Sequence, residues 1–172
     1  MRVLLTGMSG TGTSTLVAEL RRRGVTAYDA DDDDDGFSEP RGNGRWGWRR
    51  AAVAALLERH TEGLLCFAGC SEEQADLPFD YRVLLTAPEA VLIERLRTRT
   101  HNPYGRTDAE LAQILSDRAE VEPRLRRTAD LVLESTVSPA RLADAVLSSV
   151  GPSSPPAPGT ATPAVDAANG GS

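Results

Sequence analysis

A glycine-rich segment, Gly7-Met8-Ser9-Gly10-Thr11-Gly12-Thr13-Ser14-Thr15, combines residue types and spacing that are suited to binding an anion. Its glycines let the backbone wrap closely around the anion, with successive N–H groups pointing inward. The segment follows a short apolar run and opens a helical pattern, so a helix N-terminus adds a favourable dipole. We therefore expect it to bind a phosphate group; a glycine turn without a ligand is the alternative. The residues expected to take part are Gly7, Ser9, Gly10, Thr11, Gly12, Thr13, Ser14 and Thr15.

The same segment resembles the Walker A pattern G-x-x-x-x-G-K-[ST], but Thr13 occupies the lysine position. Ser14 is placed to coordinate Mg²⁺. Thr13 donates a neutral hydrogen bond, worth about 1 kcal/mol against about 1.5–3 kcal/mol for a charged one. Nucleotide binding on the backbone would therefore survive in weakened form, and the chemical step would lose more. The chain has no lysine, and its 19 basic residues are all arginine, so only an arginine could substitute.

A second candidate segment, Tyr28-Asp29-Ala30-Asp31, follows another apolar run. The spacing lets one carboxylate face the Mg²⁺ shell while the other accepts a proton from a substrate hydroxyl. For Asp29 and Asp31 we expect such a function because of their place after a strand. For residues 32–35, all aspartate, we expect a solvated acidic loop.

Short apolar runs alternate with helical patterns along the chain, which predicts strands alternating with helices. This order indicates an α/β fold in which a five-stranded parallel sheet is flanked by helices on both faces. Ligands of such sheets bind beyond the carboxyl ends of the strands, so function should lie in the segments that follow them. The expected strands are Val3–Thr6, Val25–Tyr28, Leu64–Ala68, Arg82–Thr86 and Leu131–Leu133. The expected helices are Ser14–Arg23, Trp48–His60, one from Pro88 through Leu96, one after the capping box Thr107-x-x-Glu110, and one from Ser138-Pro139 to about Ser149.

Composition limits the classes of function. The chain of 172 residues carries a formal net charge of −6, which argues against a nucleic-acid-binding protein. It has no run of 18 apolar residues, so we expect no membrane span and a cytoplasmic protein. Cys66 and Cys70 are expected to be free thiols. From Gly151 onward the chain is rich in Pro, Ala, Gly and Ser, which predicts a folded domain over residues 1–150 and a disordered tail over 151–172.

Together these features resemble the small P-loop kinases of the shikimate-kinase and nucleoside-monophosphate-kinase family, in the P-loop NTPase superfamily that includes AAA-type ATP-binding proteins. The resemblance covers about residues 1–150. It implies a three-layer P-loop NTPase fold with a short lid, and the use of ATP and Mg²⁺. It also implies that Asp29 is the Mg²⁺-associated aspartate and Asp31 the one that contacts substrate.

Three further segments extend the resemblance. Gly47-Trp48-Arg49 is similar to the family's G-F-R, which implies that Arg49 contacts an anionic substrate. Gly69 matches one of three glycines that shikimate kinases carry at this place. Glu94-Arg95-Leu96 is similar to the helix whose arginine packs on adenine, which implies that role for Arg95.

The stretch His101–Arg106 falls at the position of the family's lid. The arginine that usually precedes the lid proline is Asn102 here, and Arg99 or Arg106 could supply its charge. A second substrate-binding arginine of the family falls at Val121. These departures make shikimate an unexpected acceptor. The expected catalytic residues are Asp29, Asp31, Arg95 and Arg106.

Some side chains admit two interpretations. Arg95, Arg97 and Arg99 either serve the lid and the nucleotide site or form a solvated basic face paired with Glu94. Arg118 lies on an apolar stripe and either extends its charged end to solvent or points into a phosphate site. Trp46 and Trp48 could stack on a planar substrate, although core packing is the stronger expectation for Trp48.

The sequence therefore predicts a phosphotransferase that moves the γ-phosphate of ATP to a small anionic or hydroxylated acceptor, resembling a nucleoside, a nucleotide or shikimate. Two alternatives remain open. Thr13 could make the chain a catalytically impaired nucleotide-binding protein, or the acceptor could be water, as in a simple NTPase. We expect a monomer or weak dimer with no nucleic-acid or membrane partner.

Overall fold

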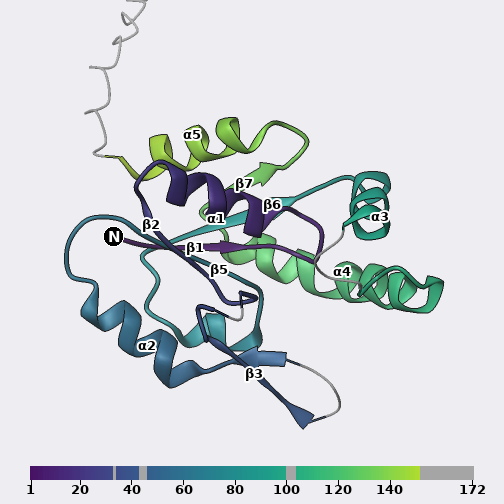
Figure 1. Cartoon of the computed structure of the whole chain (residues 1–172), viewed down its shortest axis with the longest axis horizontal. Coiled ribbons are helices and arrows are strands. Elements are labelled where there is room, and N and C mark those ends of the chain that lie inside the picture. Colours follow the sequence, from purple (N-terminus) through teal and green to yellow (C-terminus); the bar gives the residue numbers. More distant parts are fainter. Residues whose placement is uncertain (33, 43–45, 100–103, 152–172) are drawn as a thin grey trace, which may run out of the picture.

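The chain folds around a parallel β-sheet in a computed structural model that describes residues 1–32, 34–42, 46–99 and 104–151 (Figure 1). Five strands pair in the order β2-β5-β1-β6-β7, and every pairing is parallel. They are β1 Arg2–Thr6, β2 Thr26–Asp29, β5 Leu65–Ala68, β6 Tyr81–Thr86 and β7 Leu131–Glu134. The predicted five-stranded parallel sheet is confirmed, and each strand end lies within one residue of its prediction.

Helices α1 (Thr13–Arg22) and α5 (Pro139–Val150) cover one face of the sheet (Figure 1). Helix α1 buries Leu16, Val17 and Leu20, which recur at helical spacing and pack in one cluster with strand residues such as Val3 and Leu5. Ser138 accepts a hydrogen bond from the N–H of Arg141, and Pro139 occupies the first turn of α5, as predicted. The packing of α1 on this face of the sheet holds the start of the helix next to the glycine-rich segment, residues 7–15.

The other face is covered by α2 (Arg50–Arg59) and by an antiparallel pair of short strands, β3 (Ser38–Pro40) and β4 (Trp46–Trp48). The predicted helix from Trp48 is wrong at its start, because Trp48 ends β4 and α2 begins at Arg50. The core position of Trp48 is confirmed: it is 2% exposed and meets Phe67 edge to face, with ring centroids 5.1 Å apart.

Helices α3 (Glu89–Thr98) and α4 (Asp108–Thr128) follow β6, and α4 lies on the same side of the sheet as α2 (Figure 1). The predicted capping box is confirmed, since Thr107 Oγ1 accepts from Glu110 N and Glu110 Oε2 accepts from Thr107 N. Pro88 stands one residue before α3, as its N-cap. Arg118 donates to the Ala87 carbonyl and to Glu122, so it makes a structural contact on α4.

Two predicted features lie wholly or mainly outside the described residues: the tail after Gly151, and residues 101–103 of the lid stretch. No helix within the described ranges is long and apolar enough to cross a membrane. Both thiols are free; Cys66 is buried, and burial raises the pKa of its thiol to about 12.

Candidate functional site

A cavity of about 1070 Å³ opens at the carboxyl ends of the strands. Every residue from Gly7 to Thr15 lines it, together with residues that follow β2, β5 and β7. This is the place where parallel sheets bind ligands, because loops from several strands converge there. We call it the main cavity, and residues 7–15 the glycine-rich loop.

The shape of the glycine-rich loop is fixed by close internal contacts. Thr11 is buried, and both its N–H and its hydroxyl donate to the Met8 carbonyl, at 3.1 and 2.8 Å. A Cβ on Gly7 would lie 2.5 Å from Thr11 Oγ1 and 2.6 Å from the Leu85 carbonyl oxygen, so only glycine fits. Gly10 and Gly12 have φ values of 88° and 92°, a backbone region that residues with side chains rarely adopt. These contacts and backbone angles hold the loop in one compact conformation.

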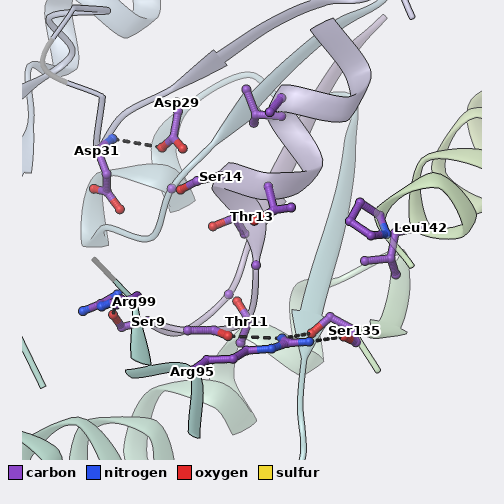
Figure 2. A pocket seen from close by; sticks show the side chains of 18 of the residues that line it. Ser9, Thr11, Thr13, Ser14, Asp29, Asp31, Arg95, Arg99, Ser135 and Leu142 are labelled. Carbon is purple, nitrogen blue, oxygen red and sulfur yellow. Dashed lines mark hydrogen bonds between the residues drawn. The ribbon is translucent and has the colours of Figure 1, made fainter. Parts of the chain in front are cut away.

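Helix α1 begins directly after this loop, with Gly12 as its N-cap. No side chain caps the helix, and its first turn contains no acidic residue. The N–H groups of the first turn of any helix have no partner within the helix. Thr13 and Ser14, the first two residues of α1, both line the main cavity, and their hydroxyls point toward it (Figure 2). The helix therefore offers unpartnered donors and a positive dipole end to an anion.

Asp29 and Asp31 lie beside Ser14, on the side of the main cavity formed by the end of β2 (Figure 2). Asp29 is 5% exposed, and its Oδ1 accepts a hydrogen bond from the N–H of Asp31 at 3.0 Å. Asp31 opens into the cavity. Its side chain is exposed to solvent on the cavity side, while nearby protein atoms partly desolvate it. This desolvation, followed by the negative charge of Asp29, raises the pKa of its carboxyl group; the charge of Arg99 acts in the opposite direction. A carboxyl group with a raised pKa next to a cavity is suited to accepting a proton.

The acidic segment after Asp31 is more ordered than its composition predicts. Asp35 accepts a hydrogen bond from the Asp29 N–H at 2.7 Å, and its side chain is 15% exposed. Arg21 forms ion pairs with Asp35 and Asp32 and donates to the Ala27 carbonyl. These contacts hold the segment that carries Asp29 and Asp31 against α1. Asp33 lies outside the described residues.

Arg95 lies on the opposite side of the main cavity, on α3. Its guanidinium donates to Ser135 Oγ at 2.9 Å, to the Ser135 carbonyl at 2.6 Å and to the Gly10 carbonyl at 3.3 Å (Figure 2). These bonds connect α3, the glycine-rich loop and the segment after β7. Arg95 is thus held in place before any ligand binds.

Arg99 is the C-cap of α3, and its side chain also reaches the main cavity. Its Nη1 donates to the hydroxyl of Ser9 in the glycine-rich loop at 3.2 Å, and its Nη2 donates to the Tyr104 carbonyl. Desolvation and the nearby charge of Arg106 lower the pKa of the Arg99 guanidinium, while Asp31 acts to raise it.

The structure brings most of the predicted site residues together in this cavity, but not all of them. Gly69 lines it, and its φ of 145° and its closeness to Trp48 Cζ2, 2.9 Å from the position of a Cβ, require glycine. Arg106 is exposed and donates to the Arg99 carbonyl. Arg49 lines a separate cavity of about 600 Å³, where it contacts the Gly36 carbonyl and Glu39. Arg106 and Arg49 are therefore not among the residues that line the main cavity.

Sequence reasoning missed several residues that line the main cavity. Ser135 is 2% exposed and directly follows β7, so the rule about strand ends could have identified it. Cys70 follows β5 directly after Gly69, and it also lines the cavity. The apolar residues Val137, Pro139 and Leu142 also line the cavity, and no local sequence signal marks them as cavity residues.

Comparisons with known proteins agree with this architecture. The sequence profile of the AAA domain family matches residues 3–116. No curated protein matches the chain by sequence.

Among solved structures, a shikimate kinase from Acinetobacter baumannii in complex with shikimate is similar, with a TM-score of 0.62 and 19% identity over 87% of this chain and 92% of the other. A sugar kinase from Janibacter has a TM-score of 0.58 and 19% identity over 86% and 92% of the two chains. A deoxyadenosine kinase from M. mycoides with bound dATP has a TM-score of 0.56 and 12% identity over 88% and 100%. At these identities the likeness concerns the fold.

Proposed function

The chain belongs to the AAA domain family and has the fold of the small P-loop kinases, and on this premise we propose that it is an ATP-dependent phosphotransferase acting on a small molecule. The observation that carries the proposal is the main cavity itself. Its lining includes the glycine-rich loop, where the first N–H groups of α1 have no partner within the helix. It also includes a partly desolvated carboxylate, that of Asp31. One end suits a phosphate donor, and the other suits an acceptor that must lose a proton.

The donor would bind with its phosphates along the glycine-rich loop. Gly7, Gly10 and Gly12 have no side chain that would keep a phosphate away from the backbone there. The first turn of α1 presents N–H groups and a positive dipole end. The base of the nucleotide would lie near the apolar residues Val137 and Leu142 of the cavity. Arg95 is held at its edge by Ser135, which leaves its planar face for stacking on an aromatic base.

Magnesium would be held by the Ser14 hydroxyl and the Asp29 carboxylate. These two side chains lie next to each other and combine the oxygen donors that Mg²⁺ prefers (Figure 2). Within the described residues, no group of three or more His, Cys, Asp or Glu could hold a metal ion alone. This fits Mg²⁺, which usually takes one or two protein oxygens and completes its shell with phosphates and water. When bound, it would neutralise charge on the two terminal phosphates.

The acceptor would lie against Asp31. An acceptor hydroxyl gives its proton to Asp31 as its oxygen bonds to the γ-phosphorus, and the bond from that phosphorus to the bridging oxygen breaks, leaving the electron pair on ADP. The residues of the chain contribute by positioning and by stabilising charge. Asp31 and Asp29 make this end of the cavity acidic, and Arg49 lies in another cavity. The acceptor that this supports best is a hydroxylated small molecule.

Thr13 supports a second candidate, a nucleotide-binding protein without transferase activity. A threonine cannot follow developing charge on the phosphates as a lysine ammonium does, and the rest of the loop would still bind nucleotide through its backbone. A simple NTPase, with water as acceptor, is the third candidate.

A screen for ADP release separates these candidates. The full chain would be incubated with ATP and Mg²⁺, alone and with a panel of sugars, polyols, nucleosides and hydroxy acids. We expect ADP release that depends on one acceptor class and on Mg²⁺. Release without any acceptor would favour the NTPase, and ATP binding with no release in any mixture would favour the nucleotide-binding protein.

A further inference from the structure

The main cavity has a shortage of positive charge at the point where phosphate would bind. The chain contains no lysine, and Thr13 stands where the Walker A pattern has one. Among the described residues, the cations that line the cavity are Arg21, Arg95 and Arg99. One of these three arginines would have to bind the terminal phosphate.

Arg21 and Arg95 are already committed to other acceptors. Arg21 is paired with Asp32 and Asp35 and donates to a backbone carbonyl. Arg95 donates hydrogen bonds from Nη1 and Nη2 to Ser135 and from Nη1 to the Gly10 carbonyl. A guanidinium whose donors are occupied loses those bonds if it turns to a new anion, so neither residue is well suited to this role.

Arg99 is different. Within the described part of the chain, no carboxylate lies within 4 Å of its guanidinium nitrogens, and its Nε is buried without a hydrogen-bond partner. A buried donor left unsatisfied is unfavourable, and such groups in folded proteins commonly await a ligand or water. Its known contacts are the Ser9 hydroxyl and the Tyr104 carbonyl, both neutral.

Arg99 also lies where a terminal phosphate would be. Ser9, to which it donates, belongs to the glycine-rich loop that would bind the phosphates. In Figure 2 the hydroxyls of Thr13 and Ser14 point into a space that has Asp31 on one side and Arg99 with Ser9 on the other. Arg99 therefore faces the loop from the side opposite the carboxylates.

We propose that Arg99 replaces the missing lysine of the glycine-rich loop, binding the terminal phosphate of ATP from the end of α3 while Ser9 orients its guanidinium. This rests on the proposed nucleotide-dependent function and adds a residue to it. A guanidinium suits the task because its planar fork binds two phosphate oxygens at once and stays charged even when its pKa is lowered by burial. The charge that the Walker A lysine gives to the terminal phosphate thus comes from Arg99, which is distant in the sequence from the loop.

The test compares the affinities of ATP and ADP, because only ATP has the terminal phosphate. Four proteins are titrated by calorimetry with each nucleotide and Mg²⁺: the unaltered chain, Arg99→Ala, Thr13→Lys and the double variant. A charged hydrogen bond of about 1.5–3 kcal/mol corresponds to a loss of about 10- to 100-fold in ATP affinity for Arg99→Ala, with a smaller loss for ADP. Arg97→Ala is the matched control, since Arg97 is on the same helix, has a side chain that is 55% exposed and, among the described residues, pairs with Asp108.

Thr13→Lys supplies the second, sharper criterion. If Arg99 does the work of the lysine, Thr13→Lys raises ATP affinity much more in the Arg99→Ala protein than in the unaltered chain. Equal gains in both backgrounds would overturn the proposal, as would an ATP-to-ADP affinity ratio that Arg99→Ala leaves unchanged. If Arg99→Ala does not fold, Arg99→Gln, which keeps most of the length, is measured against the same two criteria.

The failure of this proposal can be told from failure of the proposed function. If the unaltered chain binds no ATP at millimolar concentration, the nucleotide-dependent function itself is wrong, and Arg99 with it. If the unaltered chain binds ATP normally and Arg99→Ala binds it equally well, only the role of Arg99 is wrong.

Discussion

Asp31 lines the main cavity at the end where we propose that the acceptor binds, and its substitution should separate binding from transfer. Asp31→Asn removes the proton acceptor and keeps the shape of the side chain. We expect transfer to fall by about 10²- to 10⁴-fold, with ATP affinity nearly unchanged. Steady-state rates and a calorimetric titration of the same preparation check this. A normal rate would remove Asp31 as the base.

The raised pKa of Asp31 has two consequences of known sign. Transfer needs the carboxylate, so the rate should fall as the pH drops through this raised pKa. A group whose folded-state pKa is raised contributes stability below its unfolded pKa and loses it as the pH rises. At neutral pH the charged Asp31 therefore opposes folding, and Asp31→Asn should raise the melting temperature there and not at acid pH.

Gly7 allows the glycine-rich loop to close on Thr11. In Gly7→Ala the added methyl would lie 2.5 Å from Thr11 Oγ1 and 2.6 Å from a backbone oxygen, which cannot move away easily. We expect a loss of about 1–3 kcal/mol in the free energy of unfolding, together with weaker ATP binding. Gly42→Ala is the control, because a Cβ there would meet nothing within 4 Å. Equal stability of the two variants in urea denaturation would contradict the packing described for Gly7.

Single residues of the site differ in how far the sequence could predict them. Thr13, Ser14, Asp29 and Asp31 lie within short motifs directly after strands, and all four line the main cavity. The contact between Arg99 and Ser9 joins residues 90 positions apart and depends on where α3 ends, which no local pattern specifies. Arg49 is the arginine of a motif that resembles the family's G-F-R, but its side chain turns to Gly36 and Glu39.

Among the elements, strands buried on both faces were the easiest to predict. Residues 3–5 of β1 and all of β5 are continuous apolar runs, because helices cover both sides of a parallel sheet. The hairpin of β3 and β4 was missed, since each strand has only three residues and Pro40 is a poor strand former. Trp48 then looked like the first residue of a helix, although its burial against Phe67 places it at the end of β4.

The packing of α1 against α5 depends on charge as well as on apolar contacts. Glu19 accepts hydrogen bonds from Arg22 and Arg23, and Arg23 continues to Asp144 and the Ala140 carbonyl of α5. The hydrogen bonds from Arg22 and then Arg23 lower the pKa of the Glu19 carboxyl group to about 2 from its ordinary 4.5. A lowered folded-state pKa means that the stabilisation is present above the unfolded pKa and is lost as the pH falls.

Glu19→Gln should therefore destabilise the fold at pH 7, and the difference from the unaltered chain should shrink between about pH 4.5 and about pH 2. Urea denaturation at several pH values measures this. Glu120→Gln is the control, because Glu120 and its partner Arg124 are 68% and 63% exposed and such pairs contribute little. A difference for Glu19→Gln that stays constant with pH would show that the ion pairs are not its cause.

At the level of the whole molecule, the fold brings most of the candidate site residues to one cavity while the chain as a whole is acidic. The net charge is −6, yet α1 directs its positive end, and the end of α3 directs Arg95 and Arg99, toward the glycine-rich loop. This arrangement would attract nucleotide phosphates locally without a generally basic surface. A chain without lysine can therefore keep a phosphate-binding site if the backbone and arginine supply the charge.

The most direct test of this account is a calorimetric titration of the unaltered chain with ATP, with and without Mg²⁺. We predict saturable binding to a single site, tighter with Mg²⁺ because Ser14 and Asp29 would hold the ion. No binding of ATP at millimolar concentration, with the protein shown to be folded by circular dichroism, would contradict the assignment of the main cavity as a nucleotide site.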